Sequence, residues 1–111
     1  MTTSVVIPVY NGENYLQDNL PFVNRIDVDE IVIVDDASTD GSAEFIAENY
    51  PAIKLVRHQV NLRFPISIND GFKNATGDIV FLLNQDLKPQ KDLVKNTVRH
   101  FNNPDVFAVT L

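Results

Sequence analysis

Three apolar runs of the sequence end directly in polar residues whose oxygen atoms could bind a ligand or a metal ion. The runs are "SVVIPV" (4–9), "EIVIV" (30–34) and "DIVFLL" (78–83), and they are followed by Tyr10-Asn11-Gly12, Asp35-Asp36 and Asn84-Gln85-Asp86. Carboxylate and carbonyl oxygens suit hard divalent cations such as Mg²⁺. Each group alone has an ordinary interpretation as a turn or a helix cap. Their joint occurrence at three strand ends favours a single site.

The elements that carry these groups alternate between strand and helix patterns. Apolar runs predict strands over 4–9, 30–34, 53–58, 78–83 and 106–111, and helical spacing predicts helices over 13–26, 40–50, 64–76 and 91–103. This alternation indicates an α/β fold, a Rossmann-like three-layer sandwich with a mostly parallel sheet.

The strand patterns also predict the order of the sheet. The run 53–58 alternates at its start, which is typical of an edge strand. Right-handed crossovers then favour the order 3-2-1-4-5. The first, second and fourth strands are neighbours in this order. Their polar groups should therefore converge on one crevice beyond the carboxyl ends of the strands.

Three helices carry more specific expectations. Pro21 lies inside the apolar stripe of the first helix and should kink or split it. Asp40 or Ser38 is the expected N-cap of the second helix. The face of the third helix that is expected to be buried carries Phe64, Ile68, Phe72 and Ala75.

Composition narrows the possible functions. The chain has 111 residues, of which 44% are hydrophobic and 22% charged, which suits one globular domain. It has no cysteine, so disulfides and thiolate metal sites are excluded. The net charge is −6 and the nine Lys and Arg residues are scattered, so we expect no nucleic-acid partner. A phosphate-bearing ligand would need placed cations, backbone N–H groups or a divalent metal.

The remaining charged residues and sequence motifs add little to the prediction of function. Arg57 and Arg63 are predicted as surface charges, either of which could reach a phosphate. His58 and His100 are predicted to be surface or partly packed residues. The sequence has no G-x-G-x-x-G, G-K-[ST] or G-x-S-x-G motif, which disfavours dinucleotide oxidoreductases, P-loop hydrolases and α/β-hydrolases.

The stretches "SVVIPVYNGENYL", "EIVIVDDASTDGSAE" and "NLRFPISINDGFKNATGDIVFLLNQD" together resemble the start of family-two glycosyltransferases of the GT-A fold. The resemblance covers residues 3–111, and the L-N-x-D pattern around Asn84 is similar to a rhamnosyltransferase-like subgroup. It implies a truncated GT-A fold in which residues 1–111 form the nucleotide-sugar-binding, or donor, half. The half that carries the acceptor site and the catalytic base would be absent.

The resemblance also implies roles for single residues. Pro8, Val9 and Tyr10 would line the base and Asn11 would complete that part of the site. Asp35 would accept a hydrogen bond from the base edge, and Asp36 would order a loop or reach the ribose. Asp86 would bind Mg²⁺ or Mn²⁺ between the two phosphates. Asn84 replaces the first acid of the D-x-D motif, so it would contact the ribose or a water on the metal.

The implied reaction is metal-assisted transfer, with inversion, of a sugar from a UDP-, GDP- or dTDP-linked donor to an acceptor hydroxyl. The acceptor would be a sugar or a lipid-linked glycan in polysaccharide or glycoconjugate synthesis. No catalytic residue is assigned, so we expect no transfer by this chain alone. The expected location is the cytoplasm or the inner face of the plasma membrane. Truncation would leave an open edge near residues 106–111, which predicts self-association.

Other functions fit the sequence less completely. A non-catalytic nucleotide-sugar-binding module has the same fold and the same strand ends. A receiver-like signalling domain also uses strand-end acids with Mg²⁺, but its acidic pair follows the first strand, whereas the pair here follows the second. A nucleotidyltransferase would show a glycine-rich, basic signature near the first strand, and "YNGEN" is neither.

Overall fold

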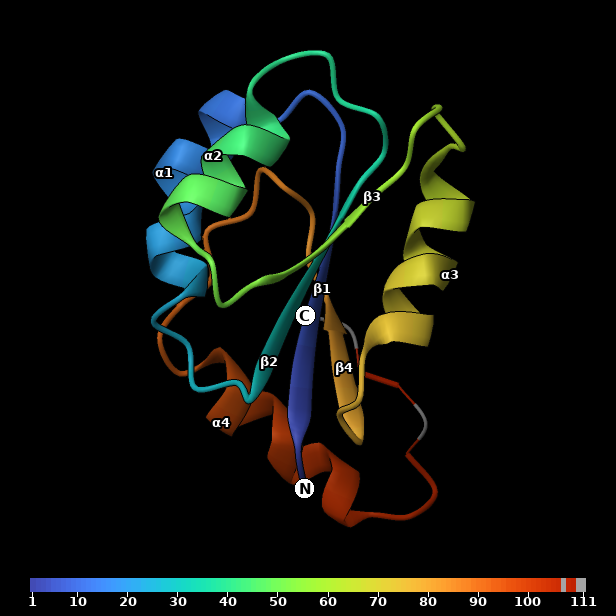
Figure 1. Cartoon of the computed structure of the whole chain (residues 1–111). Helices are drawn as coiled ribbons and strands as arrows, with labels where there is room; N and C mark the ends of the chain where they lie inside the picture. The colour runs from blue at the N-terminus through green and yellow to red at the C-terminus, as the bar shows by residue number, and fades with distance from the viewer. Residues whose placement is uncertain (107, 110–111) are drawn as a thin grey trace.

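The computed structural model describes residues 1–106 and 108–109 (Figure 1). Strands and helices alternate along the chain. They are, in order, β1 (Thr3–Val9), α1 (Glu13–Val23), β2 (Glu30–Asp35), α2 (Ser42–Asn49), β3 (Lys54–Arg57), α3 (Phe64–Asn74), β4 (Ile79–Leu82), α4 (Leu93–Val98) and the 3₁₀ helix η1 (Arg99–Asn102). Within the described residues, no helix is long and apolar enough to cross a bilayer.

The strands form one parallel sheet in the order β3-β2-β1-β4, as predicted for the first four strands. β3 lies at the edge, as its alternating pattern predicts. Val9 at the end of β1 pairs with Asp35 at the end of β2, so these two strands stop at the same level. The predicted fifth strand, 106–111, falls partly outside the described residues, and those that are described there form no strand.

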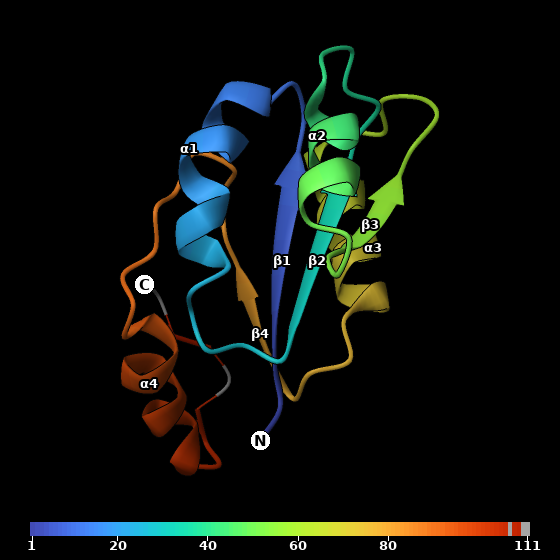
Figure 2. The same ribbon diagram turned by 60° about the vertical axis from the view of Figure 1, so that its left-hand side comes forward.

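Helices cover both faces of this sheet, which produces the predicted three layers (Figures 1 and 2). α1 and α2 pack on one face, where Val5, Ile7 and Ile33 belong to the larger core cluster. α3 lies on the opposite face over a smaller cluster that includes Val6 and Val34. Both faces of β1 and β2 are therefore buried, which explains why these strands are continuous apolar runs.

Two expectations about helix ends differ from the structure. α1 is not split at Pro21, because this proline lies in the last turn and the helix ends at Val23. The N-cap of α2 is Gly41, which follows both expected residues, Ser38 and Asp40. The Asp40 carboxylate nevertheless accepts a hydrogen bond from the backbone N–H of Ser42 at 2.9 Å, so it still satisfies the first turn of α2.

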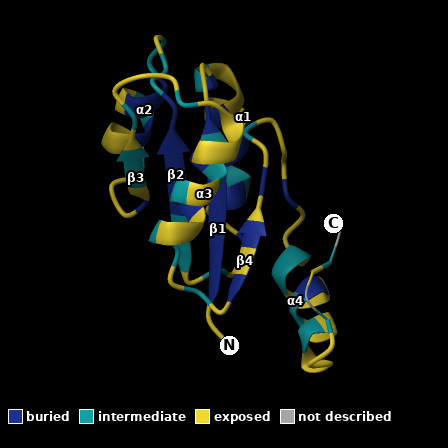
Figure 3. Ribbon diagram, turned by 90° about the vertical axis from the view of Figure 1, so that its right-hand side faces the viewer, coloured by how far each residue is buried: buried dark blue, intermediate teal, exposed yellow. Residues whose placement is uncertain are grey.

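The expected buried face of α3 is wrong for its two phenylalanines, although Ala75, just after the helix, packs against the smaller core cluster as expected. Phe64 is 50% exposed and Phe72 is 45% exposed, whereas Ser67 and Gly71 are buried against the sheet. A Cβ atom on Gly71 would overlap the side chain of Val6, so the backbone of α3 approaches β1 closely. The face of α3 that packs on the sheet is thus the one with small residues rather than the one with large apolar residues. Exposed residues lie on its outer face (Figure 3).

Candidate functional site

A cavity of about 560 Å³ lies at the carboxyl ends of β1, β2 and β4, next to the start of α3. Its size lies in the range of small-molecule binding sites. The residues that line it are Pro8, Val9, Tyr10, Tyr15, Asp36, Asn61, Arg63, Phe64, Ser67, Asn84, Gln85 and Asp86. The polar groups of the three strand ends therefore meet in one place.

Most of the residues predicted for the site reach this cavity. Those that line it are Pro8, Val9, Tyr10, Asp36, Asn84 and the proposed metal ligand Asp86. Asn11 and Asp35 do not line it. The hydrogen bonds of Asn11 and Asp35 lie instead in the loop after β2. A direct role for either residue in binding stays a prediction.

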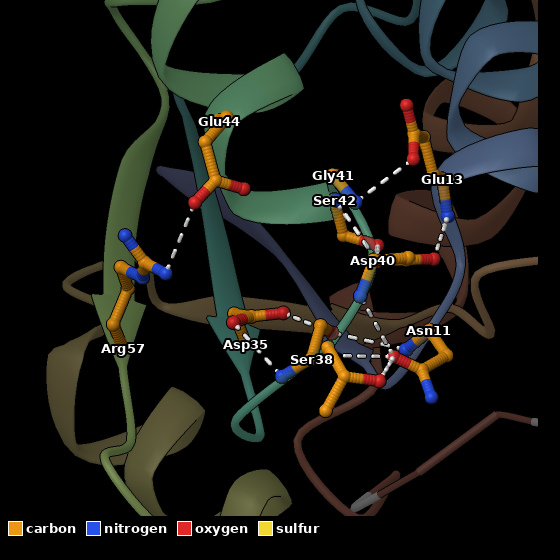
Figure 4. Close-up of polar contacts among 10 residues, drawn as sticks. Asn11, Glu13, Asp35, Ser38, Asp40, Gly41, Ser42, Glu44 and Arg57 are labelled. Carbon is orange, nitrogen blue, oxygen red and sulfur yellow. Dashed lines mark hydrogen bonds and ion pairs between the residues drawn. The ribbon is translucent and has the colours of Figure 1, made fainter.

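Asn11 and Asp35 organise the loop that follows β2 (Figure 4). The backbone N–H of Asn11 donates to the Ser38 hydroxyl at 2.9 Å, and the Asn11 side-chain oxygen accepts from the N–H of Thr39 at 2.8 Å. Asn11 has a φ of 47°, a conformation that asparagine tolerates better than most residues. Asp35 is fully buried and accepts a hydrogen bond from the Ser38 hydroxyl.

The first turns of α1 and α2 hold each other by reciprocal hydrogen bonds (Figure 4). The Asp40 carboxylate accepts from the N–H of Glu13 at 3.2 Å, and the Glu13 carboxylate accepts from the N–H of Gly41 at 2.8 Å. The N–H of Gly12 donates to the Ser42 hydroxyl at 3.1 Å. Burial opposes ionisation of Asp40, but hydrogen bonds from Ser42 and Glu13 outweigh it and lower the pKa of Asp40. We call these contacts, from Asn11 to Glu13 and from Ser38 to Ser42, the loop frame.

Gln85 joins the end of β4 to the end of β1. Its side-chain oxygen accepts from the N–H of Tyr10 at 3.0 Å, and its side-chain nitrogen donates to the Tyr10 carbonyl at 3.3 Å. The Asn19 amide donates to the Gln85 backbone carbonyl at 3.2 Å. A side chain on Gly12 would overlap the Gln85 amide and would displace it from Tyr10. Gln85 thus anchors the segment, while Asn84 and Asp86 on either side stay exposed.

Asp86 is the residue predicted to bind the metal ion. This carboxylate is exposed and lines the cavity together with the Asn84 amide. Across the described ranges, no cluster of three or more His, Cys, Asp or Glu residues is arranged to hold an ion. One carboxylate fits a divalent cation that takes its other ligands from a bound phosphate and from water, as Mg²⁺ commonly does.

Asp36 orders the segment that leads into α3, one of the two roles expected for it. Its carboxylate accepts hydrogen bonds from the backbone N–H groups of Leu62 at 2.7 Å and Arg63 at 2.9 Å. It also lies 2.8 Å from Nδ1 of His58. Burial alone would raise the pKa of Asp36, but the hydrogen bonds from Leu62, His58 and Arg63, with the charge of His58, hold it below its usual value.

The structure places Arg57 and Arg63 in different surroundings, and it does the same for the two histidines of the sequence. Arg63 lines the cavity, whereas Arg57 is exposed and pairs with Glu44 at 3.5 Å. His100 is exposed, but the side chain of His58 is only 7% exposed, so His58 is buried more deeply than expected.

Sequence reasoning missed several residues of the cavity wall, among them Asn61, Phe64 and Ser67. Ser67 is 1% exposed, and its hydroxyl has no hydrogen-bond partner among the described residues. A buried polar atom without a partner is uncommon and is expected to find one in a ligand or in water. The spacing of Ser67 and Gly71, two small residues one turn apart in an otherwise bulky helix, is the signal that could have identified it.

Comparisons with known proteins agree with this fold. The sequence model described as "Glycosyl transferase family 2" matches residues 4–111. A dolichol-phosphate mannosyltransferase from Pyrococcus furiosus is 29% identical over 98% of this chain, and the match covers 32% of that protein. An uncharacterized glycosyltransferase of Nostoc sp., alr2836, is 37% identical over 98% of this chain and 35% of its own length.

A solved structure has the same fold with its ligands bound. The mannosyltransferase PcManGT from Pyrobaculum calidifontis, in complex with GDP-Man and Mn²⁺, superposes with a TM-score of 0.85 and 30% identity, over 94% of this chain and 33% of that one. The chain thus spans about a third of the length of these proteins. The rhamnosyltransferase-like subgroup stays a prediction.

Proposed function

Because this chain belongs to glycosyl transferase family 2, a family of sugar-transferring enzymes, we propose that residues 1–111 form the part of such an enzyme that binds the nucleoside-diphosphate sugar donor. The observation that carries the proposal is the cavity in which Tyr10, Asp36 and Asp86 meet from three neighbouring strands. The GDP-Man bound to the mannosyltransferase of the same fold supports it.

The apolar wall of the cavity suits a nucleobase. Tyr10, Tyr15 and Phe64 line it and are 47%, 51% and 50% exposed, so their rings have free surface. Stacking of a base on an aromatic ring contributes about 1–3 kcal/mol to binding. Pro8 and Val9 extend this wall. Stacking is tolerant of base identity, which is compatible with UDP-, GDP- or dTDP-linked donors.

The polar side of the cavity suits a diphosphate with a divalent cation. Asp86 would hold Mg²⁺ or Mn²⁺, and Asn84 would contact the ribose or a water of the ion. The cation, when bound, offsets the charge of the diphosphate and stabilises the nucleoside diphosphate as it leaves. Arg63 lines the same cavity and supplies a second positive charge for the phosphates.

The complete reaction is proposed from the family. A hydroxyl of an acceptor sugar or lipid-linked glycan attacks the anomeric carbon with inversion, and the bond to the diphosphate breaks. A carboxylate base must remove the proton of that hydroxyl, and we assign this role to no residue of the chain. The location stays as predicted, the cytoplasm or the inner face of the plasma membrane. A non-catalytic nucleotide-sugar-binding module is the alternative.

Mn²⁺ is expected to strengthen nucleotide binding by the intact chain, and removing the carboxylate of Asp86 should abolish most of this gain in affinity. Calorimetric titration of UDP, GDP and dTDP, with and without Mn²⁺, measures this for the intact chain and for Asp86→Ala. Asp105→Ala, at another exposed aspartate, is the matched control and should bind as the intact chain does. If Mn²⁺ makes no difference to the intact chain, Asp86 is not a metal ligand. If no nucleotide binds at all, donor binding is wrong.

Replacing Ser67 with alanine is expected to weaken nucleotide binding by about 0.5–1.5 kcal/mol without lowering stability, because its hydroxyl has no partner among the described residues and would lose only the ligand bond proposed for it. The same calorimetric titration and thermal unfolding measure both effects. Ser42→Ala is the matched control. Its hydroxyl bonds Asp40 and the Gly12 N–H, so this variant should lose stability. A less stable Ser67→Ala protein with unchanged affinity would mean that Ser67 only packs.

A further inference from the structure

We propose that His58 is a positioning residue of the donor site, which holds Asp36 and, through it, keeps Arg63 in the wall of the cavity. The inference rests on the donor-binding function proposed above and adds a residue that does not itself line the cavity. It follows from the contacts of His58, from those of Asp36 and from the backbone conformation of Arg63.

His58 lies between two carboxylates. Its Nδ1 atom is 2.8 Å from Asp36 and its Nε2 atom is 2.7 Å from Asp70. Carboxylates only accept hydrogen bonds, and a neutral imidazole has a single N–H, so both contacts are hydrogen bonds only when the ring carries two protons. His58 therefore acts as a cation that joins the end of β2 to the middle of α3.

Asp36 connects His58 to the segment that precedes α3. It accepts hydrogen bonds from the backbone N–H groups of Leu62 and Arg63, and with His58 it has three donors. The side chains of Asp36 and His58 are each 7% exposed, so water competes little for these bonds. We call the set His58, Asp36 and Asp70 the histidine clamp.

Arg63 has the backbone conformation that needs such a restraint. Its φ is 78° and its ψ is 165°, a region that glycine adopts freely and that is unfavourable for a residue with a Cβ atom. Conformations of this kind persist only where the surroundings enforce them, and they occur often at functional sites. Here the Arg63 N–H donates to Asp36 at 2.9 Å and to the Asn61 side-chain oxygen at 3.0 Å, and the result is an arginine at the cavity instead of a glycine.

The charges around His58 give the clamp a pH dependence. Asp36 faces it from the end of β2 and Asp70 faces it from α3, while the neighbouring Arg57 of β3 pairs with Glu44 of α2. Burial lowers the pKa of His58, but the hydrogen bonds and charges of the two aspartates outweigh this and raise it above 6.5. The stabilisation from the protonated ring is therefore complete below pH 6.5 and is lost as the pH rises through the raised pKa.

The test combines His58→Gln and Arg63→Gly, singly and together, in the intact chain. The melting temperature is measured without ligand at about pH 6 and pH 8.5, and the affinity for UDP and GDP is measured with Mn²⁺ at the same values. His58→Gln should lower the melting temperature at the lower pH and weaken nucleotide binding there by roughly tenfold, within the range for residues of one hydrogen-bond network. It should also remove most of the pH dependence of the melting temperature. His100→Gln, at an exposed histidine, should match the intact chain.

The double variant decides whether His58 acts through Arg63. Glycine holds a φ of 78° without strain, so His58→Gln should lower the melting temperature much less in the Arg63→Gly background. An equal decrease in both backgrounds overturns the inference, as does an unchanged pH dependence in His58→Gln. If the intact chain binds no nucleotide, the proposed function is wrong, and the ligand-free melting temperatures still judge the clamp.

Discussion

Replacing Asp36 with alanine is expected to lower the free energy of unfolding by about 3–5 kcal/mol, the range found when one partner of a buried ion pair is removed. Asp36 is 5% exposed, and its carboxylate accepts hydrogen bonds from His58 and from the N–H groups of Leu62 and Arg63. Without it, the Leu62 N–H loses its partner, the Arg63 N–H keeps only the Asn61 side chain, and the ring of His58 keeps only Asp70. Nucleotide binding should fall with stability, because the same groups shape the cavity. Urea unfolding near pH 6 measures the first effect.

The controls for this result separate charge from position. Asp105→Ala removes an equal charge from the surface and should change stability by less than about 0.5 kcal/mol. Asp36→Asn keeps the shape and one acceptor, so it should lie between the intact chain and Asp36→Ala. An exposed ion pair usually contributes under about 1 kcal/mol to the free energy of unfolding. If Asp36→Ala lowers this free energy by no more than that, water enters the clamp.

The second large effect is expected at Gly71. Its replacement by alanine should destabilise the fold by about 1–3 kcal/mol, because the added Cβ overlaps Val6 and α3 must move away from β1. Ser67 and Arg63 move with α3, so the cavity should change shape and nucleotide affinity should fall. Urea unfolding and calorimetric titration measure the two effects.

A second substitution tests whether the overlap is the cause. Val6→Ala removes the methyl group that the new Cβ would meet, so adding Gly71→Ala to it should cost much less than Gly71→Ala costs alone. If the two effects simply add, the loss at Gly71 comes from the backbone of α3 and not from its contact with Val6.

Some of this molecule could be predicted because its signals are local. The order of the first four strands follows from apolar runs and an alternating edge strand, and the cavity follows from polar residues at strand ends. Periodicity failed for α3 because it counts large apolar side chains, whereas Ser67 and Gly71 are buried for being small. Three helix residues that looked like core are exposed or half-exposed as a result: Phe64, Ile68 and Phe72.

The clamp could not be predicted, because its signals are not local. His58 meets Asp36 from 22 positions away and Asp70 from 12, and nothing in its own neighbourhood marks it as buried. The glycine-type conformation of Arg63 is likewise invisible in the sequence, since arginine does not favour it. Asp35 and Asp36 are adjacent acids at one strand end, and only their contacts in the structure distinguish a buried loop anchor, Asp35, from a residue of the cavity wall, Asp36.

The loop frame also has a consequence for the order in which the site forms. Its contacts join residues 27 to 30 positions apart, such as Glu13 with Asp40 and Gly12 with Ser42. The bond from Tyr10 to Gln85 spans 75 positions. Chains emerge from the ribosome N-terminus first, and short loops close at a lower entropic cost than long ones. The loop frame, which joins the ends of β1 and β2, can therefore assemble on the nascent chain before Asp86 has been synthesised.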